Sequence, residues 1–238
     1  MRLVLVRHGE TTANVRGCLD TGRPGASLTA RGRAQARALA ERWPDLAGDA
    51  PTIVAVSPLA RTRQTAGPLL ARYGVSPLIR PGAREILAGD LEMNGDRPSG
   101  IRYGQVVSAW ACGGFDVRMP GGETGAHVLA RALAVVDEVL RRAGQRAGGD
   151  GIGVIVAHGS VLRTLAPFLA ADLPGRLAAA HPLDNAHTAV LETDGPLPDG
   201  RAAAGAAGST RASAWSWEGR FHALTWDERP PSQWSSRG

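Results

Sequence analysis

The sequence predicts an α/β protein, a three-layer α/β/α sandwich with a mostly parallel central sheet and an inserted lid. Three observations support this prediction. Strand-like and helix-like segments alternate along the chain, apolar runs such as residues 152–157 are continuous, as in buried strands, and two of these runs end in His-Gly. With 238 residues and 43% hydrophobic content, the chain suits one domain with a sizeable core.

Each element is predicted from local patterns and from its start and stop signals. The expected strands are residues 3–6, 53–56, 78–79, 152–157, 187–192 and 214–226. The first expected helix ends near Trp43-Pro44 and begins after Ser27 or Thr29, either of which can cap it. The second runs from about Leu59 to just before Gly74, and the fourth from Ser160 to about Ala171. The third runs from Ala126 to Ala143, where Gly144 is expected to stop it. Pro68 should kink or interrupt the second helix.

The remaining segments define the expected domain organisation. Residues 88–122 contain Gly, Pro and Arg without clear periodicity, which indicates a lid over a site. We expect one domain over residues 1–227, with a flexible Ala/Gly/Pro-rich loop at 195–208. Residues 228–238 are expected to form a loose tail.

Composition argues against several classes of protein. The formal charge is +5, but all 27 basic residues are arginine and they are scattered, so the pattern indicates compositional bias and no nucleic-acid binding. A membrane span is not expected, because no apolar stretch reaches 18 residues. Cys18 and Cys112 predict neither a disulfide framework nor a cysteine-based zinc site. The N-terminal apolar run is too short for a signal peptide, so a cytoplasmic protein is expected.

Reactive side chains directly follow two of the expected strands. Arg7-His8-Gly9 comes after residues 3–6, and His158-Gly159 comes after residues 152–157. Because open α/β sheets bind ligands at the carboxyl ends of their strands, two imidazoles placed there could meet in one site. A third segment follows residues 53–56 and reads Ser-Pro-Leu-Ala-Arg-Thr-Arg-Gln-Thr from Ser57 to Thr65.

In this order the three motifs resemble those of the histidine phosphatase superfamily, also called the phosphoglycerate mutase-like family. The resemblance covers about the first 190 residues. It implies that His8 is the nucleophile that forms a phosphohistidine, because a neutral ring nitrogen can attack phosphorus. Arg7 and Arg61 would hold the phosphoryl oxygens with their guanidinium groups. His158, Gly159 and Asn14 would complete the phosphate site, although Asn14 is also an ordinary turn or cap residue.

A proton donor is also needed, because an alkoxide leaving group must be protonated as the ester bond breaks. Glu85 begins a Glu-x-x-x-Gly segment similar to that of the family, and its alternative is a surface carboxylate paired with Arg84. Glu92 is the reserve candidate. The family's usual aromatic residue is replaced by Leu91, which puts recognition of the substrate by the lid in doubt.

Other polar residues have ordinary structural interpretations. Ser160 lacks the Gly-x-Ser-x-Gly setting of a hydrolase nucleophile and is expected to be a helix N-cap. Arg63 is expected to be a solvated or salt-bridged helix residue. Metal ligands are not expected, because no His-x-x-x-His or equivalent cluster exists. The remaining histidines are expected to be structural: His127, His181, His187 and His222.

The predicted function is that of a metal-independent phosphomonoesterase without a cofactor, acting on a small phosphoester. The close alternative is a phosphoglycerate mutase. The family's mutases carry a lysine- and tyrosine-bearing insertion and Glu-Arg-His-Tyr-Gly around the acid, whereas this chain has no lysine and reads Glu85-Ile86-Leu87-Ala88-Gly89. A module that only binds a phosphorylated ligand is the third hypothesis. Arg97, Arg102 and Arg118 could line the entrance, the substrate is left open, and a homodimer is expected from the resemblance alone.

Overall fold

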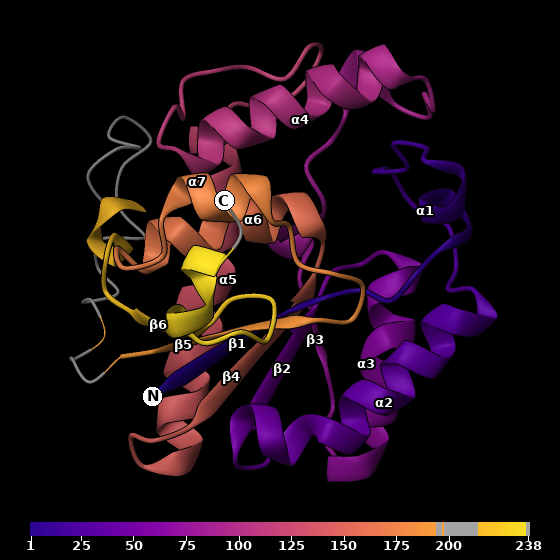
Figure 1. Cartoon of the computed structure of the whole chain (residues 1–238). Helices are drawn as coiled ribbons and strands as arrows, with labels where there is room; N and C mark the ends of the chain where they lie inside the picture. Colours follow the sequence, from indigo (N-terminus) through magenta and orange to yellow (C-terminus); the bar gives the residue numbers. More distant parts are fainter. Residues whose placement is uncertain (194–196, 198–213, 237–238) are drawn as a thin grey trace.

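A mixed sheet forms the centre of the structure, a computed structural model that describes residues 1–193, 197 and 214–236 (Figure 1). Its strand order is β3-β2-β4-β1-β5-β6. The strands are β1 (Arg2–Arg7), β2 (Ile53–Val56), β3 (Leu78–Ile79), β4 (Ile152–Ala157), β5 (Thr188–Glu192) and β6 (His222–Thr225). The first four are mutually parallel, and β5 and β6 run antiparallel to their neighbours. The predicted mostly parallel sheet is therefore confirmed.

Helices cover both faces of this sheet, which gives the predicted three layers. The α-helices are α1 (Thr12–Arg16), α2 (Ala30–Ala47), α3 (Ala60–Tyr73), α4 (Arg97–Ala111), α5 (Gly125–Ala147), α6 (Gly159–Leu169) and α7 (Gly175–Ala180). Short 3-10 helices lie at Pro81–Ala83, Gly89–Leu91, Ala214–Trp217 and Pro231–Ser236. Helices α2 and α3 pack on one face, and α5 and α6 pack on the other, with α4 and α7 beyond α6 (Figure 1).

The alternation of side chains in β1 explains how one strand serves two cores. Leu3 and Leu5 belong to the core shared with α5 and α6, whereas Val4 and Val6 belong to the core shared with α2 and α3. All four are fully buried, as expected for a central strand with helices on both sides. A short continuous apolar run, such as residues 3–6, is therefore what a central strand buried on both faces requires.

Strand register places the chemical residues together. Arg7 of β1 pairs with Ala157 of β4, and Val56 of β2 pairs with Val156 of β4. His8, Ser57 and His158 therefore leave the sheet at the same edge, as the His-Gly motifs predict. The close approach of α2 to this edge requires glycine, because a Cβ on Gly9 would lie 2.7 Å from the carbonyl oxygen of Gly32.

The expected lid, residues 88–122, contains a helix that the sequence analysis did not predict. Asp96 caps α4 through its side chain, which accepts from the backbone amide of Ser99, and Pro98 lies in the first turn. Figure 1 shows α4 lying across α6 and α7, and its buried residues Tyr103, Val106 and Trp110 pack into the same core. Gly100 and Gly104 interrupt the apolar pattern and lower its helix propensity.

Several predicted boundaries differ in detail. Helix α2 continues through Pro44 to Ala47, and α3 includes Pro68 without interruption. Helix α5 passes Gly144 and ends at Gly148, whose φ of 66° is left-handed.

Near the C-terminus, the expected strand at 214–226 is a 3-10 helix followed by β6. The expected loose tail instead has a 3-10 helix at Pro231–Ser236, and Trp234 in that helix packs against the core. Apart from residue 197, the expected loop at 195–208 lies outside the described residues.

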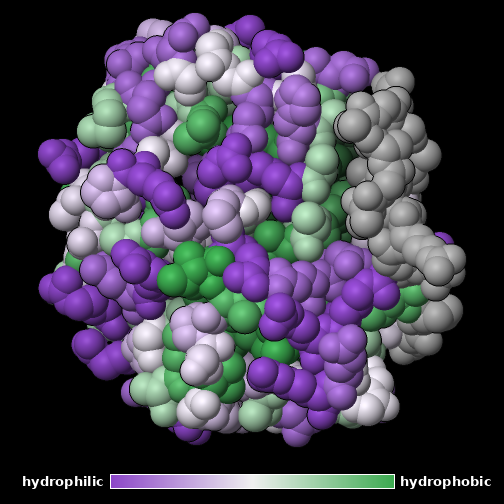
Figure 2. Space-filling view, turned by 180° about the vertical axis from the view of Figure 1, so that it is seen from behind, coloured by the Kyte–Doolittle hydropathy of each residue, from purple (hydrophilic) through white to green (hydrophobic). Residues whose placement is uncertain are grey.

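The face of the described part that Figure 2 presents is mainly polar. Figure 2 shows small apolar patches among polar residues on the face seen from behind. No helix within the described residues is both long and apolar enough to cross a membrane.

Candidate active site

The imidazole of His8 is buried at the end of β1, with 4% of the residue exposed. Its Nδ1 lies 2.8 Å from the carbonyl oxygen of Gly9, which can only accept a hydrogen bond. In the neutral ring Nδ1 therefore carries the proton, and Nε2 keeps its lone pair. Burial, together with the charges of Arg61 and Arg7, holds the pKa of His8 well below its usual value of 6.5. The ring is therefore a neutral base with one available nitrogen.

His158 lies edge-on to His8, with the ring centroids 5.2 Å apart. Arg61 Nε donates to His158 Nδ1 at 3.1 Å, so this nitrogen has no proton. His158 Nε2 must then carry the proton, and it donates to Ser57 Oγ at 2.8 Å. Burial and the neighbouring His8 hold the pKa of His158 well below 6.5. Both ring nitrogens are thus engaged within the protein.

Arg61 comes from the first turn of α3 and is 3% exposed. Besides contacting His158, its NH2 donates to the carbonyl oxygen of Asp20 at 2.9 Å, and its NH1 lies 3.4 Å from the carboxylate of Asp20. The Asp20 carboxylate also accepts from the amide of Ala26 at 2.6 Å. Asp20 therefore fixes the plane of the Arg61 guanidinium group. Thr65, the last residue of this motif, accepts from the amide of Gly9 at 2.9 Å and joins α3 to the end of β1.

The Arg7 guanidinium group has one nitrogen with a hydrogen-bond partner and another without one among the described residues. Its NH1 donates to the carbonyl oxygen of Leu183 at 2.5 Å, whereas its buried Nε has no hydrogen-bond partner among the described residues. A Cβ on Gly159 would lie 3.2 Å from this Nε. A larger residue in place of Gly159 would therefore crowd the Arg7 side chain.

Glu85 is 8% exposed and accepts hydrogen bonds from the first turn of α6. Its Oε1 accepts from the amides of Ile86 at 2.9 Å and Val161 at 3.0 Å, and its Oε2 accepts from the amide of Ser160 at 3.2 Å. The expected N-cap role of Ser160 is therefore wrong: His158 occupies the N-cap position, and the distant carboxylate of Glu85 satisfies the free amides.

These side chains surround a cleft of about 370 Å³. Six of the predicted site residues line it: Arg7, His8, Asn14, Arg61, Glu85 and Gly159. His158 does not, because it lies behind His8 and Arg61 and is fully buried. These six residues thus bring to the cleft an available imidazole nitrogen, two guanidinium groups and a carboxylate, a set suited to an anionic ester.

Asn14 both takes part in the cap of α1 and lines the cleft. Its side-chain oxygen accepts from the amide of Thr11 at 3.1 Å in a capping box at the start of α1. Its Nδ2 donates to no other residue in the described part of the chain, and the residue lines the cleft. The cap therefore fixes the oxygen of this side chain and does not engage its amide nitrogen.

Other candidates lie outside the cleft. Glu92, the reserve acid, accepts from the amides of Thr21 at 2.7 Å and Gly22 at 3.0 Å and also binds the hydroxyl of Thr21. Its carboxylate thus holds the loop at 17–25. The remaining residues considered at the entrance, on α3 or as structural histidines do not line the cleft: Arg63, Arg97, Arg102, Arg118, His127, His181, His187 and His222.

The structure adds four cleft or supporting residues that the sequence analysis did not single out: Ser57, Asp20, Tyr103 and Arg163. Ser57 opens the quoted motif, so its position next to His158 could have been inferred from parallel pairing of β2 and β4. Tyr103 required recognition of α4, where the cap signal at Asp96 and the apolar spacing of 103, 106, 107 and 110 were available. Arg163 lies one turn into α6, a position that the sequence gives no reason to select.

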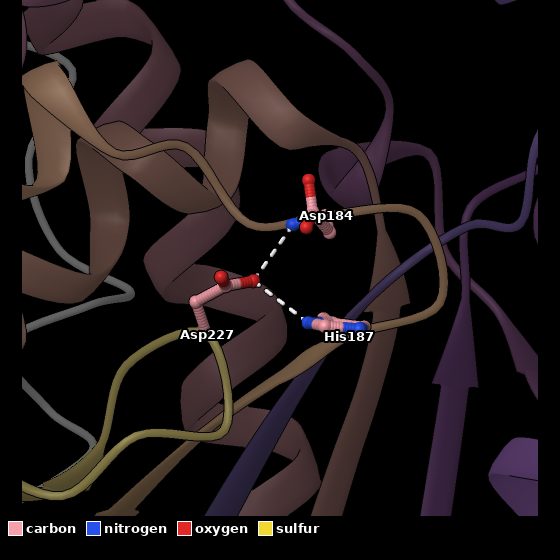
Figure 3. Close-up of side chains that lie close together, drawn as sticks. All are labelled: Asp184, His187 and Asp227. Carbon is pink, nitrogen blue, oxygen red and sulfur yellow. Dashed lines mark hydrogen bonds and ion pairs between the residues drawn. The ribbon is translucent and has the colours of Figure 1, made fainter.

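A second group of side chains lies near the end of β1, where the amide of Arg7 donates to the carbonyl oxygen of His187. Figure 3 shows Asp227 between His187 and Asp184, with its Oδ1 2.9 Å from His187 Nδ1 and 2.8 Å from the Asp184 amide. Ligand atoms of these three residues lie within 4.8 Å of one another. The hydrogen bond to Asp227 raises the pKa of His187. The Asp227 carboxylate therefore accepts from an imidazole and from a backbone amide, and it forms an ion pair with His187 when that ring is protonated.

Comparison with known proteins gives the family. Residues 3–201 match the histidine phosphatase superfamily (branch 1). A PE-PGRS family protein of Mycobacterium tuberculosis is 41% identical over 110 residues, which are 45% of this chain and 18% of that protein. A 2,3-bisphosphoglycerate-dependent phosphoglycerate mutase of Methylobacterium radiotolerans is 38% identical over 174 residues, covering 70% of this chain and 78% of that protein.

A solved structure is similar over most of the fold. The mycobacterial glucosyl-3-phosphoglycerate phosphatase in complex with VO3 has a TM-score of 0.66 and 28% identity, covering 80% of this chain and 92% of that one. The match of the family to residues 3–201 includes the three motifs and every residue placed at the cleft. The chain belongs to the histidine phosphatase superfamily.

Proposed function

We propose that this chain is a metal-independent phosphomonoesterase that hydrolyses a small phosphorylated metabolite through a phosphohistidine at His8. One observation carries the proposal: the Nδ1 proton of His8 is donated to Gly9, which leaves an unprotonated Nε2 in a cleft that also holds Arg7 and Arg61. A depressed pKa keeps this nitrogen unprotonated near neutral pH.

In the first step, His8 Nε2 attacks phosphorus while the ester P–O bond breaks. Arg7 supplies its unbonded Nε, and Arg61 supplies a second guanidinium group, to the nonbridging oxygens. These fixed cations can supply the positive charge that phosphoryl transfer needs without a metal or cofactor. His158 supports the step by holding Arg61 through Nδ1, and its role as a direct phosphate donor requires both that Arg61 releases this nitrogen and that a proton moves onto it.

Glu85 serves the leaving group. Its Oε2 accepts one amide hydrogen bond and its Oε1 accepts two, so we assign the transferable proton to Oε2. This proton passes to the leaving oxygen as the ester bond breaks. In the second step, the Glu85 carboxylate takes a proton from water, the water oxygen bonds to phosphorus, and the bond from phosphorus to His8 Nε2 breaks.

Mutase activity is the alternative, since a relative is a 2,3-bisphosphoglycerate-dependent phosphoglycerate mutase. It would require the phosphoryl group to return from His8 to a second hydroxyl instead of passing to water. The segment from Glu85 to Gly89 and the absence of lysine favour hydrolysis. Interconversion of 3- and 2-phosphoglycerate with a bisphosphate primer, at a rate above that of phosphate release, would refute the phosphatase proposal.

The first experiment measures phosphate release from a panel of phosphorylated metabolites at pH 5.5 and pH 7, with EDTA present. Release should survive EDTA, disappear in His8→Ala and persist in the control His127→Ala, which changes an exposed histidine. A labelled phosphoryl group should be trapped on the wild type and not on His8→Ala. Undiminished release by His8→Ala would remove His8 from the nucleophile role. Inactivity of the wild type throughout, with phosphate esters still bound, would support a binding module.

A further inference from the structure

The cleft extends beyond the groups assigned to phosphoryl transfer. Tyr103, Gly100 and Gly104 of α4 and Ser160 and Arg163 of α6 also line it. A Cβ added at Gly100 or Gly104 would meet no atom within 4 Å, so the glycines leave this wall of the cleft open. A cleft of about 370 Å³ is larger than a phosphate alone requires, so it has room for the leaving group.

Arg163 is the charged residue in this wall. Its Nε is buried and has no hydrogen-bond partner in the described part of the chain, and its NH1 makes only a long contact of 3.4 Å to the carbonyl oxygen of Ala179. No carboxylate lies within ion-pair distance of it among the described residues. Arg163 is half-buried and lines the cleft, and its buried Nε has no hydrogen-bond partner within the described residues, so this position favours an anion that arrives with a ligand.

Another half-buried arginine, Arg131, shows what a purely structural role looks like here. Arg131 donates to both carboxylate oxygens of Glu123 and to backbone carbonyl oxygens, including that of Gly82 at 2.8 Å. Arg163 has no such set of partners. It shares its pattern with Arg7 instead: each lines the cleft and has a buried Nε that is not hydrogen-bonded within the described residues.

We propose that the leaving group of the substrate carries a second anionic group, a carboxylate or a second phosphate, and that Arg163 binds it. This inference rests on the proposed function, in which the first phosphoryl group lies between His8 and Arg7. The Nε edge of a guanidinium group can hold two oxygens of one planar or tetrahedral anion. Arg163 is therefore a specificity-determining residue that selects among phosphoesters.

The test compares pairs of phosphoesters that differ in one anionic group. The first pair is 3-phosphoglycerate and glycerol 1-phosphate, which differ by a carboxylate in place of a hydroxymethyl group. The second pair is propane-1,3-diol bisphosphate and its monophosphate. Wild type should prefer the anionic member of one pair by about tenfold or more in kcat/KM, as expected for a charged hydrogen-bonded pair. The preferred pair identifies which anion is recognised.

Arg163→Gln should reduce that ratio to within about threefold, mainly through an increase in KM for the anionic member. Arg163→Lys keeps the charge without the Nε edge and should give an intermediate ratio. Arg102→Gln, on the exposed side of α4, is the matched control and should keep the wild-type ratio. Melting temperatures of all variants show whether a loss is one of folding.

Each outcome bears on the inference separately from the proposed function. An unchanged ratio in Arg163→Gln, or equal loss on both members of a pair, would overturn the role of Arg163 while phosphatase activity stands. Wild type that prefers the neutral members would overturn it as well. If wild type hydrolyses nothing, the proposed function fails, and calorimetric binding of 3-phosphoglycerate and the bisphosphate decides the inference. The inference is supported if Arg163→Gln binds 3-phosphoglycerate or the bisphosphate more weakly than wild type while Arg102→Gln does not. It is refuted if Arg163→Gln binds both ligands as tightly as wild type.

Discussion

The Nε of Arg61 donates to Nδ1 of His158 at 3.1 Å, and this contact fixes the tautomer of the second histidine. Since Nδ1 is an acceptor, the ring proton lies on Nε2, where Ser57 accepts it at 2.8 Å. Hydrogen bonds run from Ser57 through His158 and Arg61 to Asp20, so one network joins the ends of β2 and β4 to the loop before α2. All of its members except Asp20 are buried. It holds Arg61 beside His8.

The first prediction concerns Ser57. Ser57→Ala removes the acceptor of the His158 Nε2 proton, and a buried donor without a partner costs about 1–3 kcal/mol. We expect kcat to fall about tenfold while KM changes little, because the ring and Arg61 lose their fixed orientation. The ¹⁵N shifts of the His158 ring should report a mixture of tautomers. Ser27→Ala, at a hydroxyl 3.4 Å from the Gln64 amide on the surface, is the control. Unaltered ring shifts in Ser57→Ala would contradict the network.

The second prediction separates Glu85 from Glu92 by the leaving group. Glu85→Gln cannot donate a proton to an alkoxide, so kcat/KM for an alkyl phosphate should fall by about 10²–10⁴. For p-nitrophenyl phosphate, whose leaving group needs no proton, the loss should be much smaller. Glu92→Gln should leave the ratio of the two substrates at its wild-type value, because Glu92 holds Thr21 and Gly22. Equal losses on both substrates in Glu85→Gln would indicate that Glu85 only positions α6.

The sequence was sufficient for the central strands of the sheet and for the convergence of the motif residues on one cleft. Continuous apolar runs identify central strands, and their parallel order forces His8 and His158 to one edge. It was insufficient for α4, because Gly100 and Gly104 weaken the helical pattern that Val106 and Trp110 carry. It also missed that Glu85 caps α6 in place of Ser160, since a cap supplied from 75 residues away leaves no local pattern.

The third prediction is a pH dependence of stability that comes from His8. Its pKa in the folded protein lies well below 6.5, so the unfolded chain binds a proton that the folded chain does not as the pH falls below about 6.5. The free energy of unfolding should therefore decrease toward acidic pH, by up to about 1.4 kcal/mol per pH unit for this residue. Urea unfolding of wild type and His8→Gln between pH 7 and pH 5 measures the slope. Equal slopes would show that His8 titrates normally in the folded state.

The fourth prediction has the opposite sign and concerns the ion pair in Figure 3. Asp227 raises the pKa of His187, so the pair contributes stability that is fully present below about pH 6.5 and is lost as the pH rises through the raised pKa. Asp227→Asn keeps the acceptor for the Asp184 amide, and asparagine tolerates the local φ of 54°. The variant should therefore melt below wild type at pH 6 and close to wild type at pH 9.

The control for this prediction is Asp172→Asn, which changes a carboxylate 3.7 Å from a His222 ring whose side chain is 79% exposed. Exposed pairs contribute little, so its melting temperature should track wild type at both pH values. NMR titration should show a lower pKa for His187 in Asp227→Asn, and an unchanged His187 titration would contradict the assignment. Because Asn185, beside this pair, donates to the His8 carbonyl oxygen at 3.0 Å, loss of the pair should also loosen the backbone of His8, the proposed nucleophile. We therefore expect kcat of Asp227→Asn to fall more at pH 6 than at pH 9, relative to wild type at the same pH.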